Sequence, residues 1–305
     1  MVVIVEDKHD GYTVLDFVKK ELGMSRRLLI RLKQTGGGIS VNGLNVTVRA
    51  VLHAGDVLSL MVEDEWESHL SALAKGGMSP AAEGDSIEII YEDKYLLAVN
   101  KPSNMPTHPS FSHFDDTLAN VLSGKIATFR PINRLDLDTS GLILIAKDQL
   151  TAYKMSQKLI KGGVKKRYIA VLAGIIEPED GIIETYIKRK PDSIIEREVS
   201  KTGTESEYAK TEYHCIGKND KMSVVYAYPI TGRTHQLRVH FAYKNCPVYG
   251  DTLYGTACDE INRQALHSEM LEFNHPETGE RLKLTASVAK DIKVLYEAWL
   301  NEENI

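Results

Sequence analysis

The segment from Asp64 to Asp85 constrains the fold of this chain more than any other feature. It is polar, rich in small residues, and interrupted by three glycines and one proline, which break helices and strands, so that a frayed helix around Leu70 to Ala74 is the most regular structure it would form. Apolar residues on its two sides must therefore be buried in two separate cores, and 305 residues are enough for both. We predict a small domain over residues 1–63, a linker over residues 64–85 and a larger domain over residues 86–305.

The overall composition is that of a globular protein, with 43% hydrophobic and 26% charged residues. The formal net charge of −5 excludes a protein that is basic throughout, so any contact with nucleic acid has to use local patches. No apolar run approaches ~18 residues and the N-terminus lacks a secretory signal pattern, which predicts a cytoplasmic protein without a membrane partner. Cys215, Cys246 and Cys258 lack paired spacing, which argues against a disulfide framework or a zinc site.

The pattern of the first domain changes from helical to extended spacing. Apolar residues recur at helical spacing from Val14 to Leu22, which predicts one helix. Ser25 is a suitable N-cap for a second helix that ends at Gly36–Gly38. From Ile39 to Val48 apolar and polar residues alternate around Asn42-Gly43, which predicts a β-hairpin with a type I′ turn.

Positive charge is concentrated in the same region. Between Lys19 and Arg49, seven basic residues stand against one acidic residue. Such a run is either a solvated helix face or a surface for RNA phosphates. The order of two helices, a hairpin and Ala54-Gly55-Asp56-Val57-Leu58 resembles the alpha-L RNA-binding domain first described in a small-subunit ribosomal protein. That resemblance implies RNA contacts by Arg26, Arg27, Arg31 and Lys33.

In the larger domain, a polar run leads directly into an apolar strand. The run is Asn133-Arg134-Leu135-Asp136-Leu137-Asp138-Thr139-Ser140-Gly141, and Leu142–Ala146 follow as a predicted strand buried on both faces. Polar loops held by a rigid scaffold are common positions for catalytic side chains. Asp136 is therefore a candidate catalytic carboxylate, although a turn or cap residue has the same local pattern.

Two further segments carry chemically useful side chains. Tyr168 follows Lys166-Arg167 at the start of an apolar strand, and it is either a core residue or a ring on which a nucleobase stacks. The segment Thr231–Phe241 contains His235 and His240, whose spacing points them in different directions on a helix or a strand and argues against a shared metal ion. Taken alone, this segment also fits a helix whose arginines pair with surface acids.

These three segments, in this order, resemble the RluA-type pseudouridine synthases. One family signature, Arg-Leu-Asp, two variable residues and Thr-Ser-Gly, is complete at Arg134 to Gly141, and the other, Gly-Arg-Thr-His-Gln-Leu-Arg-Val-His, is complete at Gly232 to His240. The family commonly has histidine before Arg-Leu-Asp, where this chain has Asn133. The resemblance implies an α+β fold with a mixed, mainly antiparallel sheet and flanking helices, preceded here by the small α+β RNA-binding domain.

The resemblance also implies the reaction. Conversion of uridine into pseudouridine breaks the glycosidic bond at N1, turns the uracil and rejoins it through C5, and it needs no cofactor and no metal. Asp136 would be the catalytic carboxylate, acting either as a nucleophile on the sugar carbon or as a base on a sugar proton. Arg233 would be its ion-pair partner, Tyr168 would lie against the target base, and Arg134 would help to take the nucleotide out of its helix.

The expected substrate is structured RNA, ribosomal RNA more than transfer RNA, and no obligate protein partner is implied. Two other classes of function compete with this one. A non-catalytic RNA-binding or assembly protein could retain the fold, although it would not need Asp136, Tyr168 and Arg233 together. A carboxylate-dependent N-glycosidase would use the same residues but release free uracil.

Overall fold

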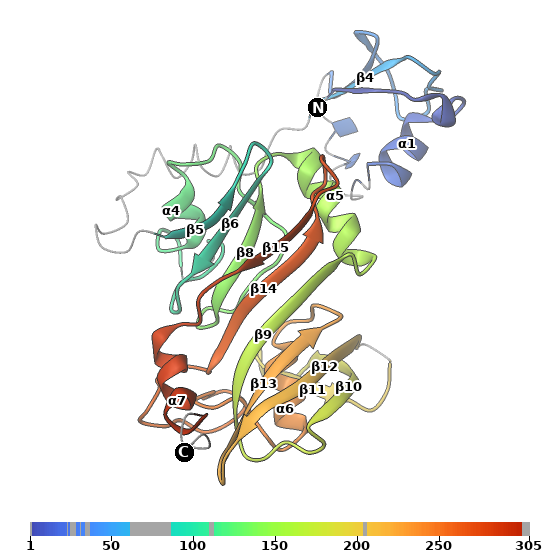
Figure 1. The fold of residues 1–305 in the computed structure, drawn as a ribbon. Helices are drawn as coiled ribbons and strands as arrows, with labels where there is room; N and C mark the ends of the chain where they lie inside the picture. The colour runs from blue at the N-terminus through green and yellow to red at the C-terminus, as the bar shows by residue number, and fades with distance from the viewer. Residues whose placement is uncertain are drawn as a thin grey trace. The chain divides into compact units, whose positions relative to one another are not determined.

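The computed structural model in Figure 1 describes residues 2–22, 24, 29–30, 32–33, 37–61, 87–109, 113–203 and 206–300. The chain forms two compact units, residues 1–78 and 79–305. The predicted linker and both of its boundaries fall within segment 62–86, outside the described residues. Among the residues that are described, no helix is both long and apolar enough to cross a membrane.

The first unit contains a four-stranded antiparallel sheet in the order β1-β4-β2-β3. Its elements are β1 (Val2–Ile4), the short helix η1 (Asp7–His9), α1 (Val14–Lys20), β2 (Ile39–Val41), β3 (Leu44–Asn45) and β4 (Val57–Leu60). The predicted hairpin is confirmed, since Asn42 and Gly43 have φ of 50° and 81°, the positive values that a type I′ turn requires. Strand β1 has no counterpart in the sequence-based prediction.

Only part of the predicted second helix is described. Residues 29–30 and 32–33 are helical, and Leu29 and Leu32 are buried in the core of this unit. Lys33 is exposed. Ser25 and three of the predicted RNA contacts lie outside the described residues: Arg26, Arg27 and Arg31.

The second unit is built around an eleven-stranded sheet whose main path has the order β11-β10-β12-β13-β9-β14-β8-β6-β5, with β15 beside β14 and β7 beside β8. The strands are β5 (Glu88–Glu92), β6 (Leu96–Lys101), β7 (Arg130–Pro131), β8 (Ser140–Ala146), β9 (Val164–Ala173), β10 (Asp180–Arg189), β11 (Arg197–Ser200), β12 (Glu207–Lys218), β13 (Met222–Pro229), β14 (Leu266–Asn274) and β15 (Arg281–Thr285). Among these described strands only β14 and β8 pair in parallel. The prediction of an α+β fold with a mixed, mainly antiparallel sheet is therefore confirmed.

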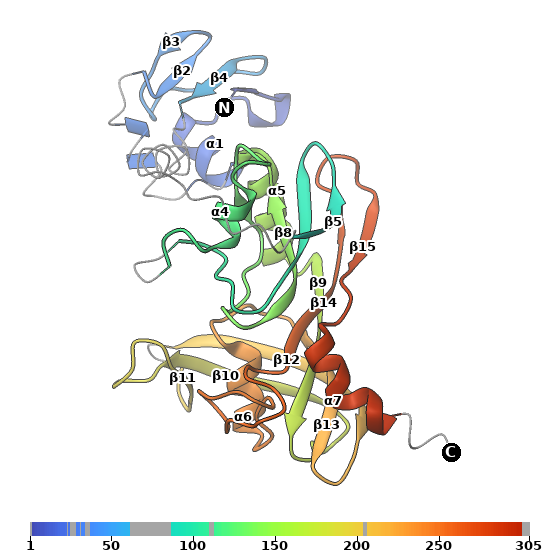
Figure 2. The ribbon, with the colours of Figure 1, turned by 90° about the vertical axis from the view of Figure 1, so that its left-hand side faces the viewer.

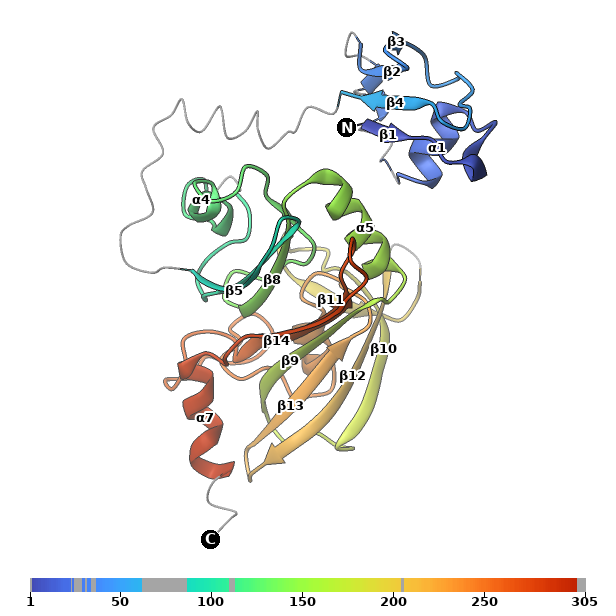
Figure 3. The ribbon, with the colours of Figure 1, turned by 45° about the horizontal axis from the view of Figure 1, so that its top comes forward.

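The long neighbouring strands β9 and β14 join two halves of this sheet, one containing β5 to β8 and the other β10 to β13 (Figure 1). The helices are α4 (Leu118–Leu122), α5 (Gln149–Ile160), α6 (Gln236–Tyr243) and α7 (Lys290–Leu300). Helix α6 packs against β11, β12 and β13 in one half (Figure 2), and α5 packs against β7 and β8 in the other. Helix α7 contacts β9, at the end of the sheet away from α5 (Figure 3).

Strand β8 is the central strand that the apolar run predicts, and all seven of its residues are buried. Its second residue is Gly141, whose φ of 112° lies in the region that side chains rarely adopt. A Cβ built on Gly141 would collide with the backbone of Ser268 in β14. Glycine at this position therefore allows the parallel approach of β8 and β14, directly behind the loop that carries Asp136.

We expect Gly141→Ala to lower the free energy of unfolding by about 3 kcal/mol or more, because alanine adds both backbone strain and a backbone collision. Urea denaturation of the purified protein measures the change. Gly124→Ala is the matched control, since a Cβ at Gly124 meets nothing within 4 Å, and it should change the free energy by less than about 1 kcal/mol. Equal changes in the two variants would contradict this account of Gly141.

Candidate active site

The loop between β7 and β8, residues 132–139, is held by hydrogen bonds to its backbone. Three of its carbonyl oxygens accept from side chains outside the loop: Leu135 O from Thr107 (3.3 Å), Leu137 O from Lys101 (3.0 Å) and Asp138 O from Arg263 (3.0 Å). The hydroxyl of Thr139 also accepts from the amide of Gln264, at 3.1 Å. Because these donors surround Asp136 on both sides, its backbone is positioned before any ligand binds.

Two of these donors are buried cations. Lys101 is fully buried, and its ammonium also donates to the carbonyl oxygens of Pro102 and Met105, at 2.8 and 2.7 Å. Burial lowers the pKa of Lys101 to about 7. Arg263 forms two hydrogen bonds with Asp291 of α7, at 2.6 and 2.8 Å, so the same guanidinium connects the C-terminal helix to the loop.

Asn133, which stands where the family commonly has histidine, binds the backbone of β8. Its side-chain amide donates to Leu142 O at 3.0 Å, and its oxygen accepts from the N–H of Leu144 at 2.9 Å. Both polar ends of the side chain are thus used within the scaffold. Asn133 therefore anchors the start of the loop to the strand behind it, at the edge of the pocket that it also lines.

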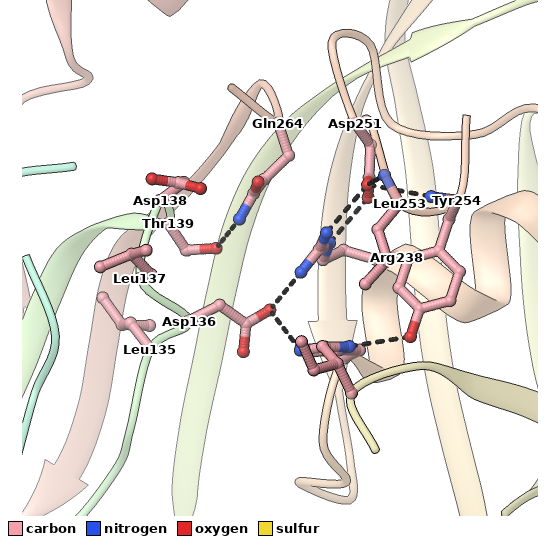
Figure 4. Close-up of polar contacts among 12 residues, drawn as sticks. Leu135, Asp136, Leu137, Asp138, Thr139, Arg238, Asp251, Leu253, Tyr254 and Gln264 are labelled. Atoms are coloured by element: carbon pink, nitrogen blue, oxygen red, sulfur yellow. Dashed lines mark hydrogen bonds and ion pairs between the residues drawn. The ribbon is translucent and has the colours of Figure 1, made fainter. Parts of the chain in front are cut away.

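Asp136 forms an ion pair with Arg238 of α6, whose Nη1 lies 3.2 Å from Asp136 Oδ2 (Figure 4). The same guanidinium makes two hydrogen bonds with Asp251, at 2.7 and 2.8 Å. Asp251 is fully buried and also accepts from the backbone N–H groups of Leu253 and Tyr254. Burial opposes the charged guanidinium, but Asp251 and Asp136 outweigh it, so the pKa of Arg238 is raised above its ordinary value.

The predicted pairing of Arg233 with Asp136 is wrong. Arg233 Nε donates to the carbonyl oxygen of Tyr208 at 2.9 Å, and its Nη1 forms an ion pair with Glu207 at 2.9 Å. Both partners belong to β12, so the guanidinium is directed toward that strand. Arg238 makes the contact instead.

The local backbone explains this difference. His235 has φ of 57°, in the left-handed region, and α6 begins directly after it. The side chain of Gln236 folds back and accepts from the Thr231 hydroxyl at 2.6 Å and from the N–H of Arg233 at 3.0 Å. Arg233 is thereby held in the turn before the helix, while Arg238 projects from the first turn of the helix itself.

The two histidines of this segment have separate partners. His235 Nε2 lies 3.9 Å from Asp136 Oδ2, and its Nδ1 is 2.8 Å from the Tyr254 hydroxyl. Burial lowers the pKa of His235 although Asp136 acts in the opposite direction, which leaves the ring uncharged at neutral pH. His240 is fully buried between the hydroxyls of Thr185 and Thr211, and burial lowers its pKa to about 4.

Asp136 opens into a pocket of about 340 Å³ that also contains the other residues proposed from the signatures: Arg134, Tyr168 and Arg233. Tyr168 is buried on β9, and burial, with a contribution from Asp136, raises its pKa to about 12. Arg134 is exposed beside the pocket. The structure therefore brings all four residues to one place, although Arg233 does not contact the carboxylate.

Sequence reasoning did not identify several residues that support this site. Arg238 stands inside the same signature as Arg233, so a motif alone does not distinguish them. Asp251, Lys101 and Arg263 are far from Asp136 in the sequence and become its supports only through the fold. A buried charge is the physical signal they share, because each requires a specific partner.

Comparisons with known proteins agree with this architecture. A sequence model of the family described as RNA pseudouridylate synthase matches residues 95–243. The Bacillus subtilis protein named uncharacterized RNA pseudouridine synthase YjbO is 40% identical over 281 residues, which cover 90% of this chain and 95% of that protein. Ribosomal large subunit pseudouridine synthase D of Xylella fastidiosa is 29% identical and covers 86% of this chain, with 81% of its own length aligned.

Among solved structures, human RNA pseudouridylate synthase domain containing 1 aligns with a TM-score of 0.58 and 27% identity, over 69% of this chain and 86% of that one. The fold, the pocket and these relatives define the class of enzyme, an RNA-modifying isomerase. The chain belongs to the RNA pseudouridine synthases. The family resemblance predicted from the two signatures is thereby confirmed.

We expect Arg238→Lys to lower kcat by about 100-fold, because one ammonium does not replace a guanidinium shared between two carboxylates. Arg233→Lys, the matched control, should lower kcat by less than about 5-fold, since Glu207 is an exposed partner. Single-turnover pseudouridine formation measures both. A larger loss in Arg233→Lys than in Arg238→Lys would restore Arg233 as the partner of Asp136.

Proposed function

We propose that this enzyme converts uridine into pseudouridine in structured RNA, and in ribosomal RNA rather than transfer RNA, through the carboxylate of Asp136. One observation carries the proposal. Both polar contacts of the Asp136 side chain reach the same oxygen, Oδ2: Arg238 Nη1 at 3.2 Å (Figure 4) and, at a longer distance, His235 Nε2 at 3.9 Å. Among the described residues Oδ1 has no hydrogen bond or ion pair, so it is available to a nucleotide in the pocket.

Two routes use this free oxygen. As a nucleophile, Oδ1 adds to the sugar C1′ as the bond to N1 breaks, and it leaves again when uracil C5 attacks C1′. As a base, it removes a proton from the sugar and returns it after the new bond has formed. In either route C5 then loses its proton to water and N1 takes up a proton from water, so the carboxylate is left unchanged. Either route also requires a fixed orientation of the carboxylate, which the ion pair with Arg238 provides.

Tyr168, which lines the same pocket, supports both routes. Its ring offers an apolar surface on which the detached uracil can turn without leaving the site. With a pKa of about 12 the hydroxyl of Tyr168 is protonated at neutral pH, so it acts as a hydrogen-bond donor to the uracil and not as a general base. Arg134 lies at the exposed rim, where a side chain can occupy the space that the target base leaves in its helix.

Three features favour ribosomal RNA as the substrate. One relative is named ribosomal large subunit pseudouridine synthase D. The first unit resembles a domain first described in a ribosomal protein, and it carries the cluster of positive charge between Lys19 and Arg49. We accordingly place the enzyme in the cytoplasm, where this RNA is found.

The substrate is tested by mapping pseudouridines in ribosomal and transfer RNA from cells that lack the gene. Loss of one or more sites from ribosomal RNA, restored by the purified wild type, supports the proposal. Loss confined to transfer RNA would contradict the choice of substrate. Nucleoside analysis of the treated RNA separates an isomerase from a glycosidase, because only the latter releases free uracil.

We expect Asp136→Asn to lower tritium release from RNA labelled at uridine C5 by about 1,000-fold or more, because an amide neither adds to C1′ nor accepts the sugar proton. Asp138→Asn is the matched control in the same loop, and it should keep activity within about 3-fold, since Asp138 contributes its backbone carbonyl to the scaffold. Wild-type activity in Asp136→Asn would overturn the assignment of the catalytic carboxylate.

We also propose that the first unit binds RNA phosphates. Changing Arg26, Arg27 and Arg31 to glutamate should weaken RNA binding strongly at low salt and less at high salt, because charge contacts release counterions. Filter binding at several salt concentrations measures the slope of the logarithm of the binding constant against the logarithm of the salt concentration. An unchanged slope would show that this unit has another role.

A further inference from the structure

Lys166 is a cation of the catalytic pocket to which the reaction described above assigns no role. It lies two residues before Tyr168 on β9, so the two side chains project from the same face of the strand. Both line the pocket with Asp136. The ammonium of Lys166 donates to the carbonyl oxygen of Thr231 at 3.2 Å and lies beside Gly232, where a Cβ would be 3.8 Å from it.

The charge of Lys166 is not balanced by the protein. Arg238 is paired with Asp251 and Arg233 with Glu207, but within the described residues no carboxylate lies within ion-pair distance of Lys166. The side chain is only half-exposed, and burial lowers its pKa to about 8. Holding an ammonium in such a place costs free energy unless a ligand supplies the missing negative charge.

RNA supplies that charge at a suitable distance from the base. A uracil placed against Tyr168 has its sugar toward Asp136 and its phosphates toward the rim of the pocket. Two residues along a strand span roughly 7 Å, a length comparable with that between the base and the phosphate of one nucleotide. The loop Thr231–Gly232 has no side chain at Gly232 to block an approaching phosphate.

We propose that Lys166 binds a phosphodiester oxygen adjoining the target uridine and so forms, with the Thr231–Gly232 loop, a phosphate subsite of the catalytic pocket. This inference rests on the function proposed above. It assigns Lys166 to substrate binding and orientation, and it leaves the chemistry at C1′ to Asp136.

The test is a double-mutant cycle between the protein and the RNA. The probe is a synthetic stem-loop of ribosomal RNA centred on a uridine that stays unmodified in cells lacking the gene. In two further stem-loops the phosphodiester on the 5′ side or on the 3′ side of that uridine is replaced by an uncharged methylphosphonate. Binding is measured for the wild type, Lys166→Met and the control Lys165→Met, which removes the same charge from the exposed neighbouring position.

Lys166→Met should weaken binding of the unmodified stem-loop about 10-fold, and Lys165→Met less than about 2-fold. One of the two methylphosphonates should weaken the wild type by a similar factor and have no further effect on Lys166→Met, because the two changes remove the same contact. Independent losses at both methylphosphonates would overturn the proposal. So would a Lys166→Met effect that disappears when the target base, rather than a phosphate, is removed.

The pH dependence of binding provides a second measurement. As pH rises from about 7 to about 9 the free Lys166 loses its proton, so wild-type binding should weaken more than that of Lys166→Arg, which stays charged at this position. Lys101, with a pKa of about 7, titrates in both proteins, so the difference between the two profiles reports on Lys166. Equal pH profiles for the wild type and Lys166→Arg would count against Lys166.

The result for the phosphate subsite can be distinguished from the result for the proposed function. Pseudouridine formation by the wild type on the unmodified stem-loop reports on the function, while coupling between Lys166 and one phosphate reports on the subsite. Activity without coupling rejects the subsite alone. Binding without any pseudouridine formation rejects the function, and the coupling still shows whether Lys166 contacts a phosphate.

Discussion

The guanidinium of Arg238 is the interaction on which the active site depends. It is shared between a buried carboxylate, Asp251, and a half-exposed one, Asp136, and therefore joins the structural core to the carboxylate that we propose is catalytic. The ion pair between Arg238 and the buried Asp251 would be electrically neutral without Asp136. The additional contact uses a guanidinium nitrogen that Asp251 does not occupy, which directs Oδ2 of Asp136 toward α6 and leaves Oδ1 toward the pocket.

The loop that carries Asp136 is held in place by two buried cations, Lys101 and Arg263, whose desolvation costs free energy. Lys101 and Arg263 both donate to carbonyl oxygens on the C-terminal side of Asp136, and both come from other parts of the sheet unit. Their desolvation is offset by carbonyl groups in one case and by Asp291 in the other. A carboxylate that must stay accessible to substrate cannot itself be packed, so its position is set through its backbone.

The charges around the pocket fall into two groups. Arg238 and Arg233 are paired with carboxylates of the protein and serve the architecture. For Lys166 and Arg134 the described residues provide no carboxylate partner, and these are the two cations for which we propose contacts with RNA. The distribution of paired and unpaired cations is the structural basis of that proposal.

The sequence by itself determined the buried strand β8, the hairpin at Asn42-Gly43 and the loop that carries Asp136, because these depend on periodicity and turn chemistry. The mainly antiparallel α+β sheet followed from the family resemblance that the two complete signatures carry. Only the tertiary structure decided that Arg238 and not Arg233 meets the carboxylate. Both arginines stand in one motif, and the left-handed residue His235 with the fold-back of Gln236 separates their directions. The residues that hold Asp136 and its loop in place likewise emerge only from the fold, since a hydrogen bond between residues far apart in sequence leaves no local pattern. They are Asp251, Lys101 and Arg263.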